Sequence, residues 1–416
     1  MKRIALPTVM LFMLSACSGQ LIPRSANTPA AKPATATRPI IRSAPVAPQP
    51  VTALAGPNAR SLGVAAAILP SGAAPYDADS ALRGLKAFRI SCPAAVRRTD
   101  QSGLTTPADW KPACDAANNW SDGDARAFFD QFFDLAQIGD GKAFATGYYQ
   151  PEIAGARTRA AGYNVPVYKR PAELVEIDLG QFSDSLKGKR IRGKVEGKTF
   201  VPFADRTGIE TGMLEGRGLE IAWAADAIDF FVLQIQGSGI LRLPDGSAMQ
   251  IGYDGQNGRD YTGIGKLMKD RGLLGPGQTS MQGIENWLRA HPDEGQAIMR
   301  ENKSWVFFKE MTGPGPFGAL NSPVTGRASV ATDPLYVPLG APVLLSMDRA
   351  DANGIWVAQD TGGAIKGSNR FDTFWGSGDQ ARATAGGMSA RGTAFVFLPK
   401  GVLARIAGAS NASPQR

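Results

Sequence analysis

The residues with the clearest chemical potential lie in one stretch near the C-terminus, from Val357 to Gly376. Asp360 follows an apolar run, and Gly362-Gly363 comes next, a pair that permits backbone conformations closed to other residues. A second carboxylate, Asp372, stands twelve residues after the first. Two carboxylates in this pattern can perform acid–base chemistry on a sugar, or they can cap turns in a glycine-rich loop.

The residues beside Asp372 predict its protonation. Phe371, Phe374 and Trp375 would exclude water from the carboxyl group, which disfavours the charged form and raises the pKa. Cleavage of a glycosidic bond needs a general acid that stays protonated in this way. A charge on Asp360 nearby would raise the pKa of Asp372 further.

The composition excludes several other chemistries. The chain of 416 residues contains one histidine, His291, and three cysteines. Histidine-rich zinc sites and four-cysteine metal sites are therefore excluded, and we expect neither a metal nor a cofactor. His291 precedes a proline at the end of an amphipathic stretch, which favours a helix cap over a catalytic role. In the segment from Arg192 to Thr199 the glycines stand one residue too close together for a phosphate-binding loop.

The net charge of +8 belongs mainly to the N-terminal region. No acidic residue occurs before residue 61, so the rest of the chain is close to neutral once this region is set aside. A basic face for nucleic acid is therefore not indicated on the folded body. The basic residues before residue 61 are Lys2, Arg3, Arg24, Lys32, Arg38, Arg42 and Arg60.

The first sixteen residues have the pattern of an export signal. Lys2 and Arg3 precede an apolar run of about eleven residues, which is too short to span a bilayer. The run ends in Leu14-Ser15-Ala16-Cys17, which resembles a bacterial lipobox, so we expect Cys17 to carry lipid and anchor the protein to a membrane. Ser18 resembles the residue found there in lipoproteins sorted to the outer membrane, which predicts a place on the periplasmic face of that membrane.

Residues 17–77 are expected to form the lipidated cysteine and a disordered tether. The stretch 18–60 holds eight prolines and no aromatic residue, so it cannot bury enough apolar surface to offset its ordering entropy. With Cys17 committed to lipid, Cys92 and Cys114 remain as a pair in an oxidising compartment. A disulfide between them is a candidate, although two thiols in the right compartment need not meet.

The body of the chain begins with helices and continues with short strands. Residues 78–146 are mostly helical in pattern and include an aromatic-rich helix expected over Ala125 to Ile138. Helical periodicity returns over residues 258–303. From Phe144 onward, on both sides of this second helical part, short apolar runs broken by turn residues indicate β-barrels rather than a doubly wound sheet. The expected strands include Val165–Tyr168, Lys198–Phe203, Phe230–Ile235, Pro342–Ser346, Gly354–Ala358 and Gly392–Pro399.

Four separated motifs together resemble the membrane-bound lytic murein transglycosylase A family, over roughly residues 80–400. The run from Asp360 to Gly367, with Phe371-Asp372 and Gly376, is similar to the signature of the three-aspartate (3D) domain. The other motifs are Gly147-Tyr148-Tyr149-Gln150-Pro151, Gln234-Ile235-Gln236-Gly237-Ser238-Gly239, and Ser329-Val330-Ala331-Thr332-Asp333 with Val337-Pro338-Leu339-Gly340.

The resemblance implies a mainly β fold with a helical N-terminal part, in which a double-psi β-barrel is interrupted by an inserted second β-barrel. The expected order is a first part over residues 78–151, the insert over 152–240 and the remainder over 241–410, with the 3D domain at about 325–400. The resemblance also implies cleavage of the β-1,4 bond between N-acetylmuramic acid and N-acetylglucosamine in peptidoglycan, with 1,6-anhydro products.

The resemblance assigns one catalytic aspartate, which acts as acid and then as base, to Asp372. We expect Asp360 to support Asp372 or to hold the loop, and Asp333 to order a turn. Lys366 either contacts the substrate or is simply solvated. The full set of expected glycan contacts is Tyr148, Gln150, Gln236, Ser238, Lys366 and Trp375.

Two other functions stay open at the level of the sequence. A glycan hydrolase resembling the barwin-like endoglucanases would need a second carboxylate to activate water, and Asp333 or Asp360 could supply it. A non-catalytic peptidoglycan-binding lipoprotein would not need Asp372. The chemical form of the cleaved sugar end separates the lyase from the hydrolase, and replacement of Asp372 separates both enzymes from the binding protein.

Overall fold

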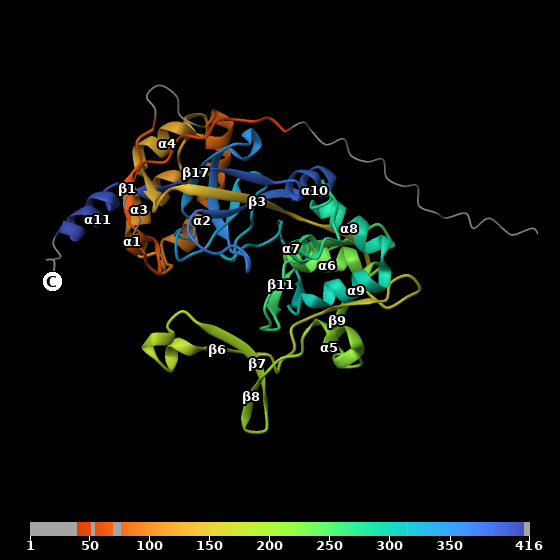
Figure 1. Ribbon diagram of the computed structural model, residues 1–416. Coiled ribbons are helices and arrows are strands. Elements are labelled where there is room, and N and C mark those ends of the chain that lie inside the picture. Colours follow the sequence, from red (N-terminus) through yellow and green to blue (C-terminus); the bar gives the residue numbers. More distant parts are fainter. Residues whose placement is uncertain (1–39, 51–54, 70–75, 314, 412–416) are drawn as a thin grey trace, which may run out of the picture. The chain divides into compact units, whose positions relative to one another are not determined.

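The computed structural model describes residues 40–50, 55–69, 76–313 and 315–411 (Figure 1). All the described residues belong to one compact unit of the chain. The expected signal over residues 1–16 and the expected lipidation at Cys17 lie outside the described residues. Within the described part of the chain, no helix is long and apolar enough to cross a membrane.

Six strands close into a barrel because β17 pairs with β14 on one side and with β3 on the other. Two further strands, β1 and β2, extend the sheet beyond β17. The expected mainly β fold with a helical N-terminal part is confirmed, while the double-psi crossing stays a prediction. The strands are β1 (Val64–Ala66), β2 (Phe133–Ile138), β3 (Lys142–Gln150), β13 (Ser329–Ala331), β14 (Pro342–Met347), β15 (Gly354–Asp360), β16 (Arg370–Ser377) and β17 (Ser389–Pro399).

The N-terminal helices lie against this barrel (Figure 1). A cluster of buried aromatic rings fills the contact between them. Phe88 and Phe128 each contact Phe133, with ring centroids 5.5 and 5.9 Å apart. The helices and turns of this body are α1 (Ala59–Leu62), α2 (Ala78–Ala95), α3 (Pro107–Ala117), η1 (Asp122–Asp124), α4 (Ala125–Phe132), η5 (Ala350–Ala352), α10 (Gly378–Gly386) and α11 (Val402–Asn411).

The helix expected over Ala125 to Ile138 is half wrong, because α4 ends at Phe132 and β2 begins at Phe133. Strand β2 pairs with β1 on one side and with β17 on the other. Ladder hydrogen bonds on both sides outweigh the helical spacing of the phenylalanines, since propensity is a weak prior against tertiary pairing.

The disordered tether expected over residues 17–77 is wrong for residues 40–50 and 55–69, which are bound to the barrel. The Val46 amide donates to Ser346 Oγ at 2.8 Å, and Thr393 Oγ1 donates to the Val46 carbonyl at 2.6 Å. The Gln49 amide donates to Gln137 Oε1 at 2.8 Å. A proline-rich segment can therefore be ordered without a large apolar surface when side chains of the barrel satisfy its backbone groups.

A second sheet of six strands has its own buried core. It takes strands from both sides of residue 240, where the insert is expected to end, and the boundary itself stays a prediction. The strands are β4 (Glu152–Ala156), β5 (Val165–Tyr168), β9 (Glu220–Ala224), β10 (Ser238–Arg242), β11 (Ala248–Gln256) and β12 (Val306–Glu310). The accompanying helices are α5 (Arg206–Gly208), η4 (Ile209–Met213), α6 (Ala227–Gln236), α7 (Ile264–Asp270), α8 (Met281–Ala290) and α9 (Pro292–Glu301).

The strand expected over Phe230–Ile235 is wrong, because these residues belong to helix α6. Asp226 caps the helix by accepting from the Asp229 amide at 2.8 Å, and Gly237 ends it with a φ of 77°. The run is buried on several sides of the helix, so it shows no polar face. Periodicity alone cannot separate such an apolar run from a buried strand.

A third sheet of three strands completes the described fold. It joins β6 (Val175–Asp178), β7 (Arg190–Glu196) and β8 (Thr199–Pro202), with the short turns η2 (Leu179–Gln181) and η3 (Asp184–Leu186) between β6 and β7. The glycine-rich segment from Arg192 to Thr199 belongs to the hairpin of β7 and β8. This agrees with the sequence prediction that it is not a phosphate-binding loop. His291 ends α8, where its ring stacks on Trp287 with centroids 4.2 Å apart.

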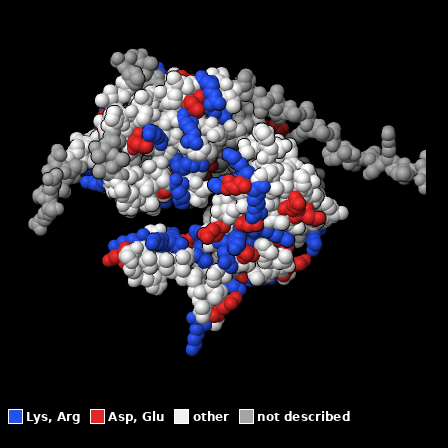
Figure 2. Space-filling model, in the orientation of Figure 1, with Lys and Arg blue, Asp and Glu red and all other residues white. Residues whose placement is uncertain are grey.

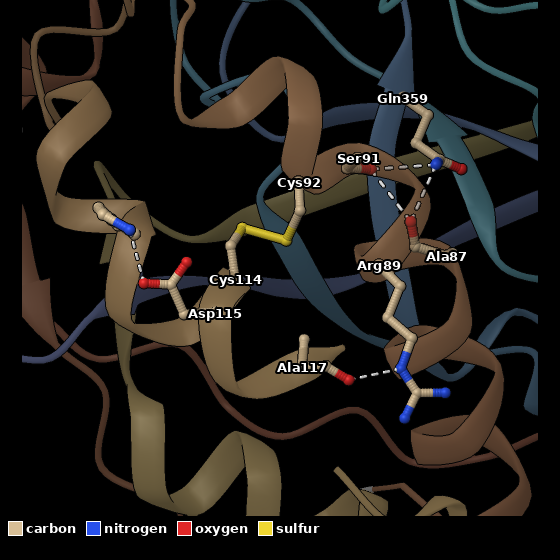
Figure 3. Close-up of a disulfide and its surroundings, with 9 residues drawn as sticks. Ala87, Arg89, Ser91, Cys92, Cys114, Asp115, Ala117 and Gln359 are labelled. Carbon is tan, nitrogen blue, oxygen red and sulfur yellow. Dashed lines mark hydrogen bonds and ion pairs between the residues drawn. A yellow bond between two sulfur atoms is a disulfide. The ribbon is translucent and has the colours of Figure 1, made fainter. Parts of the chain in front are cut away.

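Cys92 and Cys114 form a disulfide between α2 and α3 (Figure 3). On the same helix α2, the Ala87 carbonyl and Ser91 Oγ are hydrogen-bonded to Gln359 Nε2, each at 3.0 Å. The disulfide therefore fixes α3 to the helix that supports the end of β15.

We predict that replacing both cysteines by alanine lowers the free energy of unfolding by about 3 kcal/mol, because the bridge closes a loop of this size in the unfolded chain. The cysteines are 22 residues apart. Urea unfolding of the oxidised protein and of the double variant measures the difference. A loss below about 1 kcal/mol would contradict this role of the disulfide.

Candidate functional site

The two candidate carboxylates lie on the two strands that flank β13. Ala331 is in register with Asp360 of the parallel neighbour β15 and with Asp372 of the antiparallel neighbour β16. The two aspartates therefore lie at the same level of the barrel, one strand apart. Neighbouring strands are about 4.8 Å apart, so the two backbones are separated by roughly 10 Å.

The parallel pairing of β3 with β16 builds the surroundings of Asp372. Phe144, Thr146 and Tyr148 of β3 are in register with Arg370, Asp372 and Phe374 of β16. Because side chains alternate across a strand, these three pairs share one face. Each pair interacts: the Arg370 guanidinium lies 5.0 Å from the Phe144 ring centroid, Thr146 Oγ1 donates to Asp372 Oδ1 at 2.6 Å, and the Tyr148 and Phe374 rings are 4.9 Å apart.

Asp372 is a partly buried acid with one engaged oxygen. Burial raises its pKa from the usual 3.8 to about 6, against the hydrogen bond from Thr146 and the charge of Arg370, and the charge of Asp360 adds to the rise. Arg370 Nη2 donates to Thr146 Oγ1 at 2.9 Å, so Thr146 links the guanidinium to the carboxyl group. Among the described residues, nothing donates to Asp372 Oδ2, which leaves this oxygen available to a substrate.

Asp360 is held on both of its oxygens. The amides of Ala319 and Thr361 donate to Oδ1 at 3.0 and 2.8 Å, and Tyr148 Oη donates to Oδ2 at 3.0 Å. Burial raises the pKa of Asp360 to about 6, and these three hydrogen bonds oppose the rise. The pKa of Tyr148 is raised well above 10, first by burial and then by Asp360, so the phenol stays protonated and donates.

Gly147 is required where β3 passes beneath helix α10. A Cβ atom at this position would lie 2.9 Å from the Ala385 Cα, from the Met388 Cβ and from the Trp375 Nε1. Backbone and a packed indole cannot retreat from such a contact. The glycine of the Gly147-Tyr148-Tyr149-Gln150-Pro151 motif therefore allows α10 to approach the strand that carries Thr146 and Tyr148.

The aromatic shielding of Asp372 is only partly as expected. Phe374 shares a face with Asp372, but Phe371 points to the opposite face and is fully buried in the barrel core. Trp375 is half-buried against the core, and its Nε1 donates to Thr373 Oγ1 at 2.9 Å. The centroids of the Trp375 and Trp356 rings are 5.6 Å apart. The strand period of two places alternate residues on opposite faces, and proximity in sequence does not reveal this.

The other expected contacts fall into two groups. Lys366 is exposed in the loop before β16, and this loop is tied down because the Gly367 amide donates to Asp333 Oδ2 at 2.9 Å. Asp333 also accepts from the Leu335 amide at 3.1 Å, so it orders a turn as expected.

Near the end of β3, Gln236 Oε1 accepts from the Tyr149 amide at 3.0 Å. Gln150 is buried, and its Nε2 has no hydrogen-bond partner among the described residues. Ser238 is half-buried at the start of β10. The roles of these side chains toward a substrate stay predictions.

Sequence reasoning missed two residues that contact the acid or its partner, Thr146 and Arg370. The signal that could have found them is the period of two, since Thr146 stands two residues before Tyr148 and Arg370 two residues before Asp372. In the described part of the chain, no group of three histidine, cysteine, aspartate or glutamate residues could hold a metal ion.

The fold and the site define a β-barrel protein whose C-terminal half carries a 3D domain. The family model "3D domain" matches residues 328–398, and the model "MltA specific insert domain" matches residues 144–309. The solved structure of MltA from Neisseria gonorrhoeae is 31% identical, with a TM-score of 0.69, and the match covers 87% of this chain and 98% of that one. The chain therefore belongs to the MltA family.

Two further relatives have names that bear on function. Membrane-bound lytic murein transglycosylase A of Escherichia coli strain K12 is 32% identical over 263 residues, which is 61% of this chain. That match spans 64% of the length of the curated relative. The structure of E. coli MltA with bound chitohexaose is 25% identical, with a TM-score of 0.59, and the match covers 79% of this chain and 92% of that one.

We predict that Asp372→Asn stabilises the protein at pH 7.5 and that the gain disappears toward pH 4. The folded-state pKa of about 6 lies above the usual 3.8, so the folded state binds more protons between these values and loses stability as pH rises through them. Above pH 6 the charged carboxyl costs on the order of 2–3 kcal/mol, and asparagine removes this cost while it still accepts from Thr146.

Urea unfolding of both proteins at the two pH values measures the effect. A gain at pH 4 as large as the gain at pH 7.5 would contradict the raised pKa of Asp372, and so would a loss of stability at pH 7.5.

Proposed function

We propose that this protein is a peptidoglycan lytic transglycosylase that cleaves the β-1,4 bond between N-acetylmuramic acid and N-acetylglucosamine. The observation that carries the proposal is the difference between the two aspartates. Both carboxyl groups have raised pKa values, but Asp372 keeps one oxygen free of donors, whereas both oxygens of Asp360 are committed to three donors. Membership in the MltA family and the names of the relatives support the same reaction.

The proposed reaction uses Asp372 twice. In its protonated form Oδ2 donates a proton to the glycosidic oxygen while the bond to C1 breaks through an oxocarbenium-like state. The carboxylate then takes the proton from the C6 hydroxyl of the muramic residue, whose oxygen closes onto C1 and forms the 1,6-anhydro ring. The attacking hydroxyl belongs to the same sugar, so part of the entropic barrier is already removed.

Thr146 and Arg370 assist this cycle as positioning residues. The hydrogen bond from Thr146 fixes the Oδ1 side of the carboxyl group and turns Oδ2 away from it. The nearby charge of Arg370 stabilises the carboxylate that forms after proton donation. Together they oppose the effect of burial, so the pKa of Asp372 settles at about 6, near neutrality, where a group can both donate and accept a proton.

A hydrolase is the weaker proposal for this site. Hydrolysis requires a second carboxylate that activates water or forms a covalent intermediate. Asp360 has both oxygens occupied by donors, and Asp333 accepts from the amides of Leu335 and Gly367. Neither carboxylate is free to take on that role without breaking the loops it holds. The chitohexaose bound by E. coli MltA supports a β-1,4-linked amino-sugar chain as the ligand class.

We predict that the full chain releases 1,6-anhydromuropeptides from purified sacculi and that Asp372→Ala releases none, because the variant lacks the group that we propose to donate and retrieve the proton. Mass spectrometry of the soluble products measures this. The rate should fall as pH rises above about 6, since the acid form of Asp372 is then lost.

Asp245→Ala is the matched control, because Asp245 lies in the exposed turn between β10 and β11 and its loss should leave the products unchanged. Reducing-end products, heavier by one water, would favour the hydrolase. Binding of wild-type protein to sacculi without any product would favour a binding protein.

We also propose that a lipid on Cys17 anchors the protein to the periplasmic face of the outer membrane. The lipobox-like sequence and the name of the E. coli relative, a membrane-bound enzyme, support the anchor. Cys17→Ala should move the protein from the membrane fraction to the soluble fraction and leave its cleavage of added sacculi intact. Retention of the variant in the outer membrane would contradict the anchor.

A further inference from the structure

A polar pocket of about 410 Å³ lies between α2, the turn before β13 and the start of β15. The proposed reaction does not use it. Trp356 supplies an apolar wall, and the charged residues of its lining are Asp77, Arg83, Arg126, Arg327 and Asp351.

The backbone of Arg327 is fixed in an unusual conformation at the mouth of this pocket. Its φ of 61° lies in the left-handed region, which costs free energy for a residue with a side chain. The Arg327 amide donates to the Phe374 carbonyl at 2.7 Å, and its own carbonyl accepts from Arg83 Nε at 3.2 Å. Both hydrogen bonds hold the turn in place, and the exposed side chain of Arg327 is presented to the pocket.

Most of the other charges in the lining already have partners. Arg83 forms an ion pair with Asp79. Asp351 accepts from both Nε and Nη2 of Arg349 at 3.1 and 2.6 Å.

Two further charged residues of the pocket lining, Asp77 and Arg126, also have partners. Asp77 caps α2 by accepting from the Ser80 amide at 2.7 Å. Arg126 donates to the Tyr76 carbonyl and lies 5.6 Å from the centre of the Tyr76 ring.

Arg327 is the exception, because among the described residues its guanidinium has neither a hydrogen bond nor an ion pair. Burial lowers the pKa of Arg83, the nearby charge of Arg327 lowers it further, and Asp77 opposes both effects. Two guanidinium groups that repel each other across a pocket are stabilised when an anion enters between them. Figure 2 shows blue and red side chains interspersed over the face drawn. Within the pocket, Arg83 is paired with Asp79, so Arg327 is the guanidinium available to an added anion.

We propose that the Arg83–Arg327 pocket binds a carboxylate of the peptide that substitutes the glycan strand. This inference rests on the proposed function, because the peptide is attached to the muramic residues of peptidoglycan. Arginine forks bind carboxylates through paired hydrogen bonds, and the Trp356 wall suits the aliphatic part of a peptide side chain.

The position of the pocket fits such a ligand. Arg327 is bonded to Phe374, and Phe374 stands two residues after Asp372 on the same strand. Two residues of a strand span about 7 Å, so the backbone of Arg327 is hydrogen-bonded to β16 within the reach of a short peptide on a sugar bound at Asp372. The pocket would select substituted strands and would not take part in bond cleavage.

The test compares two substrates with the full chain: intact sacculi, and glycan strands from which an amidase has removed the peptides. Arg327→Gln should raise the KM for intact material by about tenfold, since one charge-assisted contact is lost, and should leave the KM for stripped strands and both kcat values unchanged. Arg327→Lys, which keeps the charge, should recover part of the loss. Arg97→Gln, an exposed arginine at the end of α2 outside the pocket, is the matched control for net charge.

Calorimetric titration with the peptides released by the amidase gives an answer that does not depend on turnover. We expect the released peptides to bind the wild type and not to bind Arg327→Gln. The same peptides with amidated carboxyl groups should not bind. Equal effects of Arg327→Gln on both substrates, no effect on either, or peptide binding that survives in the variant would overturn the pocket assignment. Absence of anhydro products from every protein would instead overturn the proposed function, and the titration would still decide the pocket.

Discussion

The parallel register between β3 and β16 is the constraint on which the site depends. It places Thr146 opposite Asp372, and its two neighbouring pairs close the same face with rings and a guanidinium. A shift of one residue would turn Thr146 and Tyr148 toward the core and bring Gly147 opposite Asp372. The acid would then lose its fixed hydrogen bond, and Asp360 would lose the phenol that donates to it. The chemistry of one carboxyl group is therefore set by a backbone pairing.

The strands next to this pair are held from outside the barrel. Helix α2 is bonded to Gln359, the residue before Asp360, and Ser329 Oγ of β13 donates to the Oε1 atom of the same glutamine. This one buried amide of β15 thus connects helix α2 to β13 one residue before Asp360. Figure 3 shows the part of the network that joins Gln359 to α2. Two acids with raised pKa values reduce stability at neutral pH. The hydrogen bonds of the buried Gln359 amide are all satisfied, so this network stabilises the fold and offsets part of the lost stability.

Much of the architecture could be predicted from the sequence, and the misses have physical reasons. The resemblance identified the family, and alternation identified strands such as Val165–Tyr168 and Pro342–Ser346. Alternation wrongly predicted a strand at Phe230–Ile235, because this helix is buried on several sides and shows no polar face. At the site, the sequence indicated Asp372, its raised pKa and the influence of Asp360. It did not reveal Thr146 or Arg370, because their roles come from the pairing of strands more than 200 residues apart. The role of Phe371 failed for a local reason, since adjacent residues of a strand face opposite sides.

The order of the barrel strands along the chain also has a consequence for how the molecule folds. Strand β3 ends at Gln150, and its barrel partners β16 and β17 begin at Arg370 and Ser389. During folding, β3 keeps an unpaired edge until strands that begin more than 200 residues later in the chain join it, and contacts of such sequence separation form slowly. The second sheet contains every strand it needs before residue 311, so it can fold in the interval and bring the two parts of the barrel closer. Asp372 thus meets Thr146 among the last events of folding. A chain cut short by translation or proteolysis can therefore contain a folded second sheet and still lack the pairing of Asp372 with Thr146.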